Sequence, residues 1–177
     1  MTDWSQIVED HGPIVWKTAY RLLGNGADAA DCFQRTFLAA VELSRRQPVR
    51  HWPALLRRLA TARALEQLRV RIRERGRQTG LSESDSQDGR ASPLEVAQAS
   101  ELAEGMRIAL GEVDPRQAQA FCLTQLEGHS YDEVAAELGV TVNHVGVLLN
   151  RARATLKERL AAFAPHRVNE TKQEVQP

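Results

Sequence analysis

The chain has 177 residues and no net charge; 42% of its residues are hydrophobic and 26% are charged. This balance is typical of one large or two small packed domains and excludes global disorder. No apolar run approaches the roughly 18 residues of a membrane span, and the N-terminus has no basic and apolar segments typical of an export signal. We expect a cytoplasmic protein without membrane insertion, whose two cysteines, Cys32 and Cys122, are reduced and buried.

The first part of the chain, residues 1–75, has the apolar spacing of three helices. Apolar positions over residues 7–23 predict a helix that starts or is interrupted at Gly12-Pro13. A Gly-Asn-Gly turn signal precedes a second helix, for which Asp28 is the predicted N-cap. Two prolines then break the pattern before a third, long helix with an apolar stripe between arginines.

Residues 76–93 are rich in Gly, Ser, Asp and Gln and have almost no apolar content, which predicts a flexible linker. A second unit over residues 94–163 and a tail over residues 164–177 follow. The helix-start signals of this part are Ser92 with Pro93, Asp114 with Pro115, Ser130 with Glu133, and Thr141. No strand pattern occurs, so the predicted fold class is all-α, with two small helical domains joined by a flexible linker.

Charge is separated along the chain although its total is zero. From Arg45 to Arg75 there are ten arginines and two acids, a net charge of +8, whereas residues 77–113 contain three arginines and seven acids, a net charge of −4. A basic block of this size indicates a polyanionic partner such as nucleic acid. A solvated helix face is the alternative interpretation.

The spacing of Ala135, Gly139 and Val145 is typical of a helix-turn-helix. That motif needs a small residue at the helix crossing, a turn residue that tolerates positive φ and a branched residue in the second helix. The predicted inward stripe of the second helix is Leu138, Val145, Leu149, Ala152 and Leu156. The segment from Val145 to Leu149 is apolar, where a DNA-reading helix is expected to be polar. Helical hairpins that do not bind DNA show the same spacing, and the cations that follow can also be a solvated face.

Residues 114–160 resemble region four of sigma factors of the sigma-seventy family. The matching pieces are Asp114-Pro115-Arg116-Gln117, Glu127-Gly128, Ser130 to Ala135, Leu138-Gly139-Val140 and Asn150 to Arg153. Residues 24–40, "GNGADAADCFQRTFLAA", and residues 52–73, "WPALLRRLATARALEQLRVRIR", resemble region two. Two such regions with only a short linker between them are similar to the extracytoplasmic-function (ECF) group. The resemblance implies a factor that binds core RNA polymerase and directs promoter-specific transcription initiation. We expect no cofactor and no metal, since the two cysteines have no further metal ligands near them in the sequence.

The resemblance implies that the second helix docks on core RNA polymerase through Asp28, Asp31, Gln34 and Phe37. Carboxylates beside an exposed aromatic ring suit a basic, partly apolar helical partner. N-capping for Asp28 and core packing for Phe37 are the alternatives.

The resemblance also implies that the third helix meets phosphates and the opening minus-ten element of promoter DNA. The arginines concerned are Arg57, Arg58, Arg63, Arg69, Arg71 and Arg73. The guanidinium fork binds phosphate and its plane stacks on bases. Trp52 would pack against an unstacked base or anchor the core. Ala62 and Glu66 stand where many relatives have Asn and Asp, so base contacts at these positions depart from the family's pattern.

The second helix of the helix-turn-helix would touch the minus-thirty-five element. The implied base contacts are Thr141, Asn143, His144, Val147 and Asn150, with Arg151 and Arg153 on phosphates. Many ECF relatives have Lys-Ser-Arg where this chain has Gly146-Val147-Leu148, so a charged groove-facing pair is missing. We therefore expect a minus-thirty-five contact that is weaker than in relatives or reads a different sequence.

Two alternatives to a sigma factor follow from the same residues. A polymerase-independent helix-turn-helix regulator would use the basic helix for phosphate contact. A sigma-like adaptor would bind protein, for example an anti-sigma factor, through Val147 and Leu148. The five histidines are scattered and none accompanies a nucleophile and an acid, so we do not expect an enzyme. For a sigma factor, an anti-sigma factor is a further expected partner beside core RNA polymerase and promoter DNA.

Overall fold

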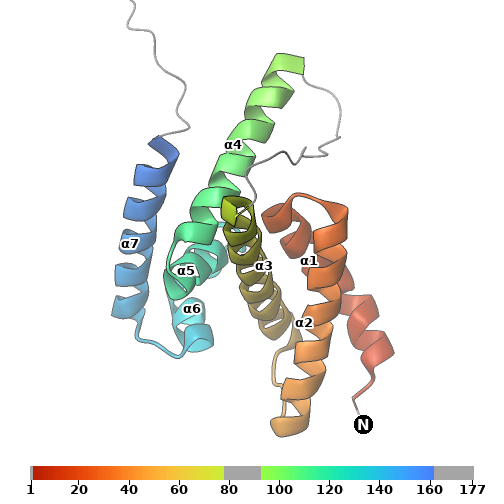
Figure 1. Ribbon diagram of the computed structural model, residues 1–177. Coiled ribbons are helices and arrows are strands. Elements are labelled where there is room, and N and C mark those ends of the chain that lie inside the picture. The colour runs from red at the N-terminus through yellow and green to blue at the C-terminus, as the bar shows by residue number, and fades with distance from the viewer. Residues whose placement is uncertain (1, 78–92, 162–177) are drawn as a thin grey trace, which may run out of the picture.

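A computed structural model describes residues 2–77 and 93–161 (Figure 1). These two stretches contain helices and no strand, which confirms the all-α prediction. The helices are α1 (Trp4–Leu23), α2 (Gly26–Arg46), α3 (Trp52–Arg77), α4 (Pro93–Glu112), α5 (Pro115–Gln125), α6 (Tyr131–Leu138) and α7 (Val142–Ala161). Within the described ranges, no helix is both long and apolar enough to cross a membrane.

The helix starts follow local capping signals, with two differences from the sequence-based expectation. Asn25 caps α2 in place of Asp28, because the extended backbone of Asn25 lets its side chain accept a 2.8 Å hydrogen bond from the backbone N–H of Asp28. The predicted cap at Asp28 is therefore wrong, and its carboxylate lies in the first turn. Helix α1 runs without a break through Pro13, which lies inside it, so the expected start or interruption there is also wrong.

In the second half of the chain the predicted caps are confirmed where they can be seen. Asp114 accepts hydrogen bonds from the backbone at the start of α5. Ser130 and Glu133 form a reciprocal capping box at α6, and the Thr141 hydroxyl accepts from a backbone N–H of α7. Ser92, most of the predicted linker and the predicted tail lie outside the described residues.

Helix α3 belongs to the first unit (α1–α3) and lies between the other two helices of that unit and the second unit (α4–α7) (Figure 1). On one side it packs against α1 and α2, and on the other against α4, α5 and α6. One hydrophobic cluster spans both units: Ala19, Leu22, Leu23, Ala29, Cys32, Ala64, Leu65, Leu68, Ala109, Leu110, Val113, Ala118, Cys122, Ala152 and Leu156. In this conformation the two units therefore share a core.

The helix-turn-helix has a smaller core of its own between α5, α6 and α7. The inward stripe of α7 is confirmed for Val145, Leu149, Ala152 and Leu156, which are buried. Leu138 was expected on the same helix, but it is the last residue of α6, from which it packs against this core. Leu148 is buried as well, at 5% exposure, so three of the five residues in the apolar segment face inward.

Both cysteines are free thiols in the core, as predicted. Burial raises the pKa of the Cys32 thiol to about 11 and that of the Cys122 thiol to about 12. Both thiols are therefore protonated and unreactive at neutral pH in the folded protein.

Two glycines of the helix-turn-helix should respond oppositely to substitution by alanine. A Cβ at Gly139 or Gly146 would meet no atom within 4 Å, so only the backbone decides. Gly139 ends α6 with φ of 64°, and Gly139→Ala should lower the free energy of unfolding by about 1–2 kcal/mol. Gly146 lies inside α7, and Gly146→Ala should raise it by about 0.5–1 kcal/mol. Urea titrations measure both, and changes of the same sign would contradict this account.

Candidate polymerase and nucleic-acid interface

The exposed face of α2 carries three of the four residues expected to dock on core polymerase. Gln34 is exposed, and Asp31 and Asp28 are partly exposed. The carboxylate of Asp31 lies 3.0 Å from the guanidinium of Arg35 and accepts a 2.9 Å hydrogen bond from Gln67 of α3. These contacts hold the Asp31 carboxylate at the junction of α2 and α3.

Phe37 does not belong to this face, and the expectation of an exposed aromatic ring there is wrong. It is only 8% exposed and packs in a cluster with Phe33, at a ring-centroid distance of 4.9 Å. The next residue, Leu38, is 64% exposed and shares the face of Asp31 and Gln34, because helix positions seven and four residues apart coincide. Sequence analysis missed Leu38, although this spacing could have identified it.

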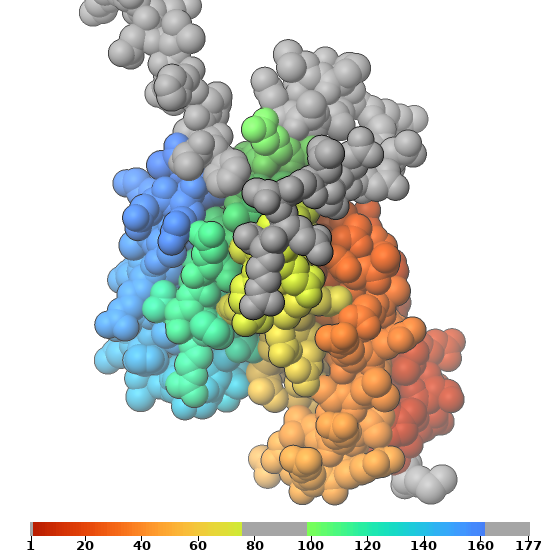
Figure 2. Space-filling view, viewed as in Figure 1, coloured from red at the N-terminus to blue at the C-terminus, as the bar shows by residue number. Residues whose placement is uncertain are grey.

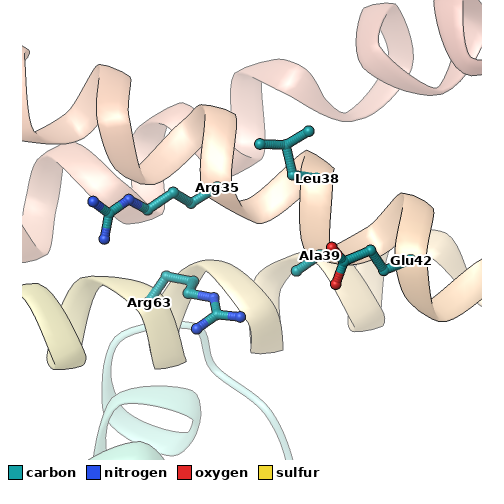
Figure 3. A pocket seen from close by; sticks show the side chains of 5 residues that line it. All are labelled: Arg35, Leu38, Ala39, Glu42 and Arg63. Atoms are coloured by element: carbon teal, nitrogen blue, oxygen red, sulfur yellow. The ribbon is translucent and has the colours of Figure 1, made fainter.

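Leu38 borders a shallow pocket of about 230 Å³ between α2 and α3 (Figure 3). Arg35, Ala39 and Glu42 of α2 and Arg63 of α3 complete its lining. Figure 3 shows that the Leu38 side chain points away from α3. The surface thus places an exposed apolar side chain among charges of both signs, a combination that suits a partly apolar, charged partner helix.

The arginines of α3 divide into an exposed and a covered set. Arg63 and Arg73 are exposed, and Arg63 pairs at 2.9 Å with Glu66 one turn away. The partly buried members, which lie toward the second unit, are Arg57, Arg58, Arg69 and Arg71. Figure 2 shows α3, in yellow, as a strip between α2 in orange and the second unit in green. Most of the arginines expected to contact DNA are therefore partly covered in this conformation.

Arg57 contacts a histidine–glutamate pair beside the helix-turn-helix, in which His129 is buried and Glu137 is partly buried. Its guanidinium donates to Nε2 of His129 at 3.1 Å, and Nδ1 of His129 lies 3.1 Å from the carboxylate of Glu137. Since a guanidinium can only donate, Nε2 must be the accepting nitrogen of the imidazole. Burial raises the pKa of the Glu137 carboxyl, against the opposing effect of the neighbouring His129 and arginines. Neither His129 nor Glu137 was expected at this interface.

Arg69 and Arg71 also make contacts inside the protein. Arg69 donates to the backbone carbonyl of Val113 at 3.4 Å, and burial lowers the pKa of its guanidinium. Arg71 lies 3.3 Å from the carboxylate of Asp28 and also pairs with Glu104 of α4. An arginine expected on DNA thus pairs with a residue expected on the polymerase.

Trp52 lies at the start of α3 and packs edge-on against Trp4, with 5.2 Å between ring centroids. It is partly buried against the core of the first unit. This packing favours the core-anchor interpretation. An open pocket of about 580 Å³ lies between the α2–α3 connection and α6, and Arg50, His51 and Arg58 contribute to its lining. Arg50 and His51 were not among the expected site residues.

The residues expected on the minus-thirty-five element lie together on the outer face of α7 and at its cap. Exposed side chains there are Thr141, Asn143, His144, Val147, Asn150, Arg151 and Arg153. Leu148 faces the core, so the adaptor interpretation with Val147 and Leu148 as a joint apolar contact is wrong for Leu148. Val147, at 42% exposure, is a single apolar residue on a polar face.

Both helical units match family models. The model described as Sigma-70 region 2 matches residues 7–74, and the one described as Sigma-70, region 4 matches residues 106–156. The chain belongs to the sigma-70 family. It is 32% identical over 165 residues to the ECF RNA polymerase sigma factor SigE of Mycolicibacterium smegmatis, a match that covers 91% of this chain and 63% of that protein. Within the family, the chain is a member of the ECF group.

Two solved structures have the same fold. The sigma factor RpoE of Bartonella quintana, in complex with the anti-sigma factor NepR, matches with a TM-score of 0.54 and 22% identity, over 91% of this chain and 98% of that chain. CnrH, in complex with the cytosolic domain of CnrY, matches with a TM-score of 0.51 and 29% identity, over 89% of this chain and 87% of that chain. At 22% identity, the likeness to RpoE of Bartonella quintana shows a shared fold and nothing more. The chain spans less than two thirds of the length of the relative SigE.

Proposed function

We propose that the protein is a cytoplasmic sigma factor that binds core RNA polymerase and directs promoter-specific transcription initiation. The observation that carries this proposal is the presence of both family regions in one chain, with expected contact residues exposed or partly exposed on one helix of each region. The exposed faces are those of α2 and α7. Such a factor acts by binding alone and catalyses no reaction itself.

The first unit, residues 1–75, would bind core polymerase through the α2 face and the minus-ten element through α3. The second, residues 94–163, would bind the minus-thirty-five element through α7, with residues 76–93 as the linker and 164–177 as a tail. On α2, we place the polymerase contact on Asp28, Asp31, Gln34 and the exposed Leu38 instead of the buried Phe37. An anti-sigma factor is a further proposed partner, since the structural relative RpoE was solved with one.

Core binding is the decisive test, and two exposed leucines provide a matched comparison. Leu38 on α2 and Leu102 on α4 are 64% and 56% exposed. Leu38→Asp should lower the affinity for purified core RNA polymerase about ten-fold, as the loss of a central apolar contact does, and so reduce co-elution with it. Leu102→Asp should retain the affinity of the unmodified protein.

The same mixtures, supplied with genomic promoter fragments, separate the candidate functions. Co-elution followed by run-off transcription supports the sigma factor. Failure of the unmodified protein to co-elute with core overturns the proposal, and DNA binding without polymerase would then favour a helix-turn-helix regulator. Co-elution without any transcript would favour an adaptor. Equal retention of the two leucine variants would refute the α2 contact.

A further inference from the structure

Glu104 of α4 accepts hydrogen bonds from three arginines. The guanidinium of Arg71 donates to both carboxylate oxygens, at 3.1 and 3.2 Å, and that of Arg75 donates at 2.6 Å. Arg107, one turn along α4, adds a contact at 3.4 Å. The Glu104 side chain is 22% exposed, so water screens these contacts only in part.

Two of these arginines belong to α3, the helix that we propose binds DNA. Both carboxylate oxygens accept from one nitrogen, Nη2 of Arg71, and Glu104 thus offers these arginines the anionic oxygen acceptors that a phosphate also offers. Burial alone would raise the pKa of the Glu104 carboxyl, but the hydrogen bond from Arg75 and the charges of all three arginines more than offset it and lower the pKa. At neutral pH, Glu104 is therefore ionised, and its carboxylate lies among the guanidinium groups of three arginines.

The helix that carries Glu104 is fitted closely to α3. A Cβ added at Gly111 of α4 would overlap the side chain of Ile72 and lie 3.6 Å from the backbone of Leu68. The absence of a side chain at Gly111 thus permits the close approach of α4 to α3. This approach, together with the shared core around Leu110 and Val113, positions the Glu104 carboxylate over the arginines.

We propose that Glu104 is an intramolecular substitute for a DNA phosphate, which holds the second unit against α3 until nucleic acid displaces it. This inference rests on the proposed DNA binding by α3 and states how that binding is regulated. Arg71 also pairs with Asp28 on the proposed polymerase-docking helix. Arg71 therefore links Glu104 of α4 to the proposed polymerase-docking helix α2.

Other contacts between the units remain when Glu104 is altered, so the expected opening is partial. Arg21 of α1 pairs with Glu127 at 2.8 Å, and Arg57 contacts His129. Partial opening still raises the affinity for DNA. The apparent affinity is proportional to the fraction of molecules in the open, binding-competent state, and opening increases this fraction.

The test uses the full chain with Glu104→Gln, which keeps the shape and removes the charge. Arg75→Gln weakens the same contact from α3, and Arg75 is not among the proposed DNA contacts. Glu101→Gln, at an exposed position one turn earlier on α4, is the control for the change in charge and helix propensity. The readouts are amide hydrogen exchange in residues 99–112 and affinity for a fluorescein-labelled single-stranded DNA of mixed sequence.

Glu104→Gln should raise the exchange rates in α4 and the affinity for the labelled DNA roughly five-fold or more, the lower end of typical coupling between sites. Arg75→Gln should raise α4 exchange similarly, which a purely local effect on α4 would not produce, and Glu101→Gln should match the unmodified protein. Unchanged exchange and affinity in Glu104→Gln would overturn the proposal, as would the absence of DNA binding by every variant. Co-elution with core polymerase tests the proposed function separately. If the protein fails to co-elute but Glu104→Gln still raises amide exchange in α4, the sigma-factor role is refuted and the contact of Glu104 with the arginines is supported.

Discussion

Leu149→Ala should lower the free energy of unfolding by about 2–5 kcal/mol, one of the largest effects expected in this protein. Leu149 is fully buried in the core of the helix-turn-helix, where its side chain contacts α5 and α6 residues. Truncation removes buried methyl groups and leaves a cavity that the short helix α6 can fill only in part. Val147→Ala, two residues away and 42% exposed, should change stability by less than about 0.5 kcal/mol.

Urea-induced unfolding followed by circular dichroism measures both variants. Because one cluster spans the two units, we expect a single transition for the described part of the chain. Similar losses in both variants would mean that Val147 also packs against a partner surface in solution. No loss in Leu149→Ala would contradict the assignment of the inward face of α7.

Capping signals and apolar spacing predicted the helices, apart from the continuity of α1 through Pro13, because both signals depend on residues within one or two turns. The capping box of Ser130 and Glu133 and the cap at Asp114 formed as expected. The cap of α2 was misplaced because Asn25 and Asp28 are both good capping residues, and only the backbone geometry decides between them.

The apolar segment of α7 shows how far sequence patterns define a surface. Five consecutive apolar residues occupy a segment where a polar reading face is expected, but Val145, Leu148 and Leu149 are buried. The burial of Leu148 was not predicted. Helix α7 packs against both α5 and α6, and such a helix buries a wider arc of its surface than the narrow stripe of Val145, Leu149, Ala152 and Leu156. The outer face therefore lacks charge mainly at Gly146 and Val147, which are not buried.

The candidate site was predictable residue by residue only where a single helix face determines exposure. Phe37 and Leu38 are adjacent, and the packing of α2 against α1 and α3 decides that the aromatic ring is inside and the leucine outside. The partners of the covered arginines could not be predicted. Glu104 and His129 lie far from α3 in sequence, and ion pairs between distant segments leave no periodic signal.

Replacing the two exposed arginines of α3, Arg63 and Arg73, by alanine should weaken DNA binding by the complex with core polymerase about ten-fold or more. Each lost phosphate contact removes a charge-assisted interaction of about 1 kcal/mol or more. It should also reduce the dependence of log affinity on log salt concentration by about 0.7–0.9 per contact. Arg45 and Arg46, exposed at the end of α2, are the matched control, since their replacement changes net charge equally but removes no proposed DNA contact.

The covered arginines should behave differently, which makes the exposed pair the sharper test. Replacing Arg69 and Arg71 by alanine removes proposed DNA contacts, but it also frees Glu104 and Asp28 and loosens α4 from α3. The loss in DNA affinity should therefore be smaller than for the exposed pair, with faster amide exchange in α4. Open-complex formation and salt titrations on a promoter fragment measure both double variants. An equal loss in the Arg45/Arg46 control would show that overall charge, and not the face of α3, carries the interaction with DNA.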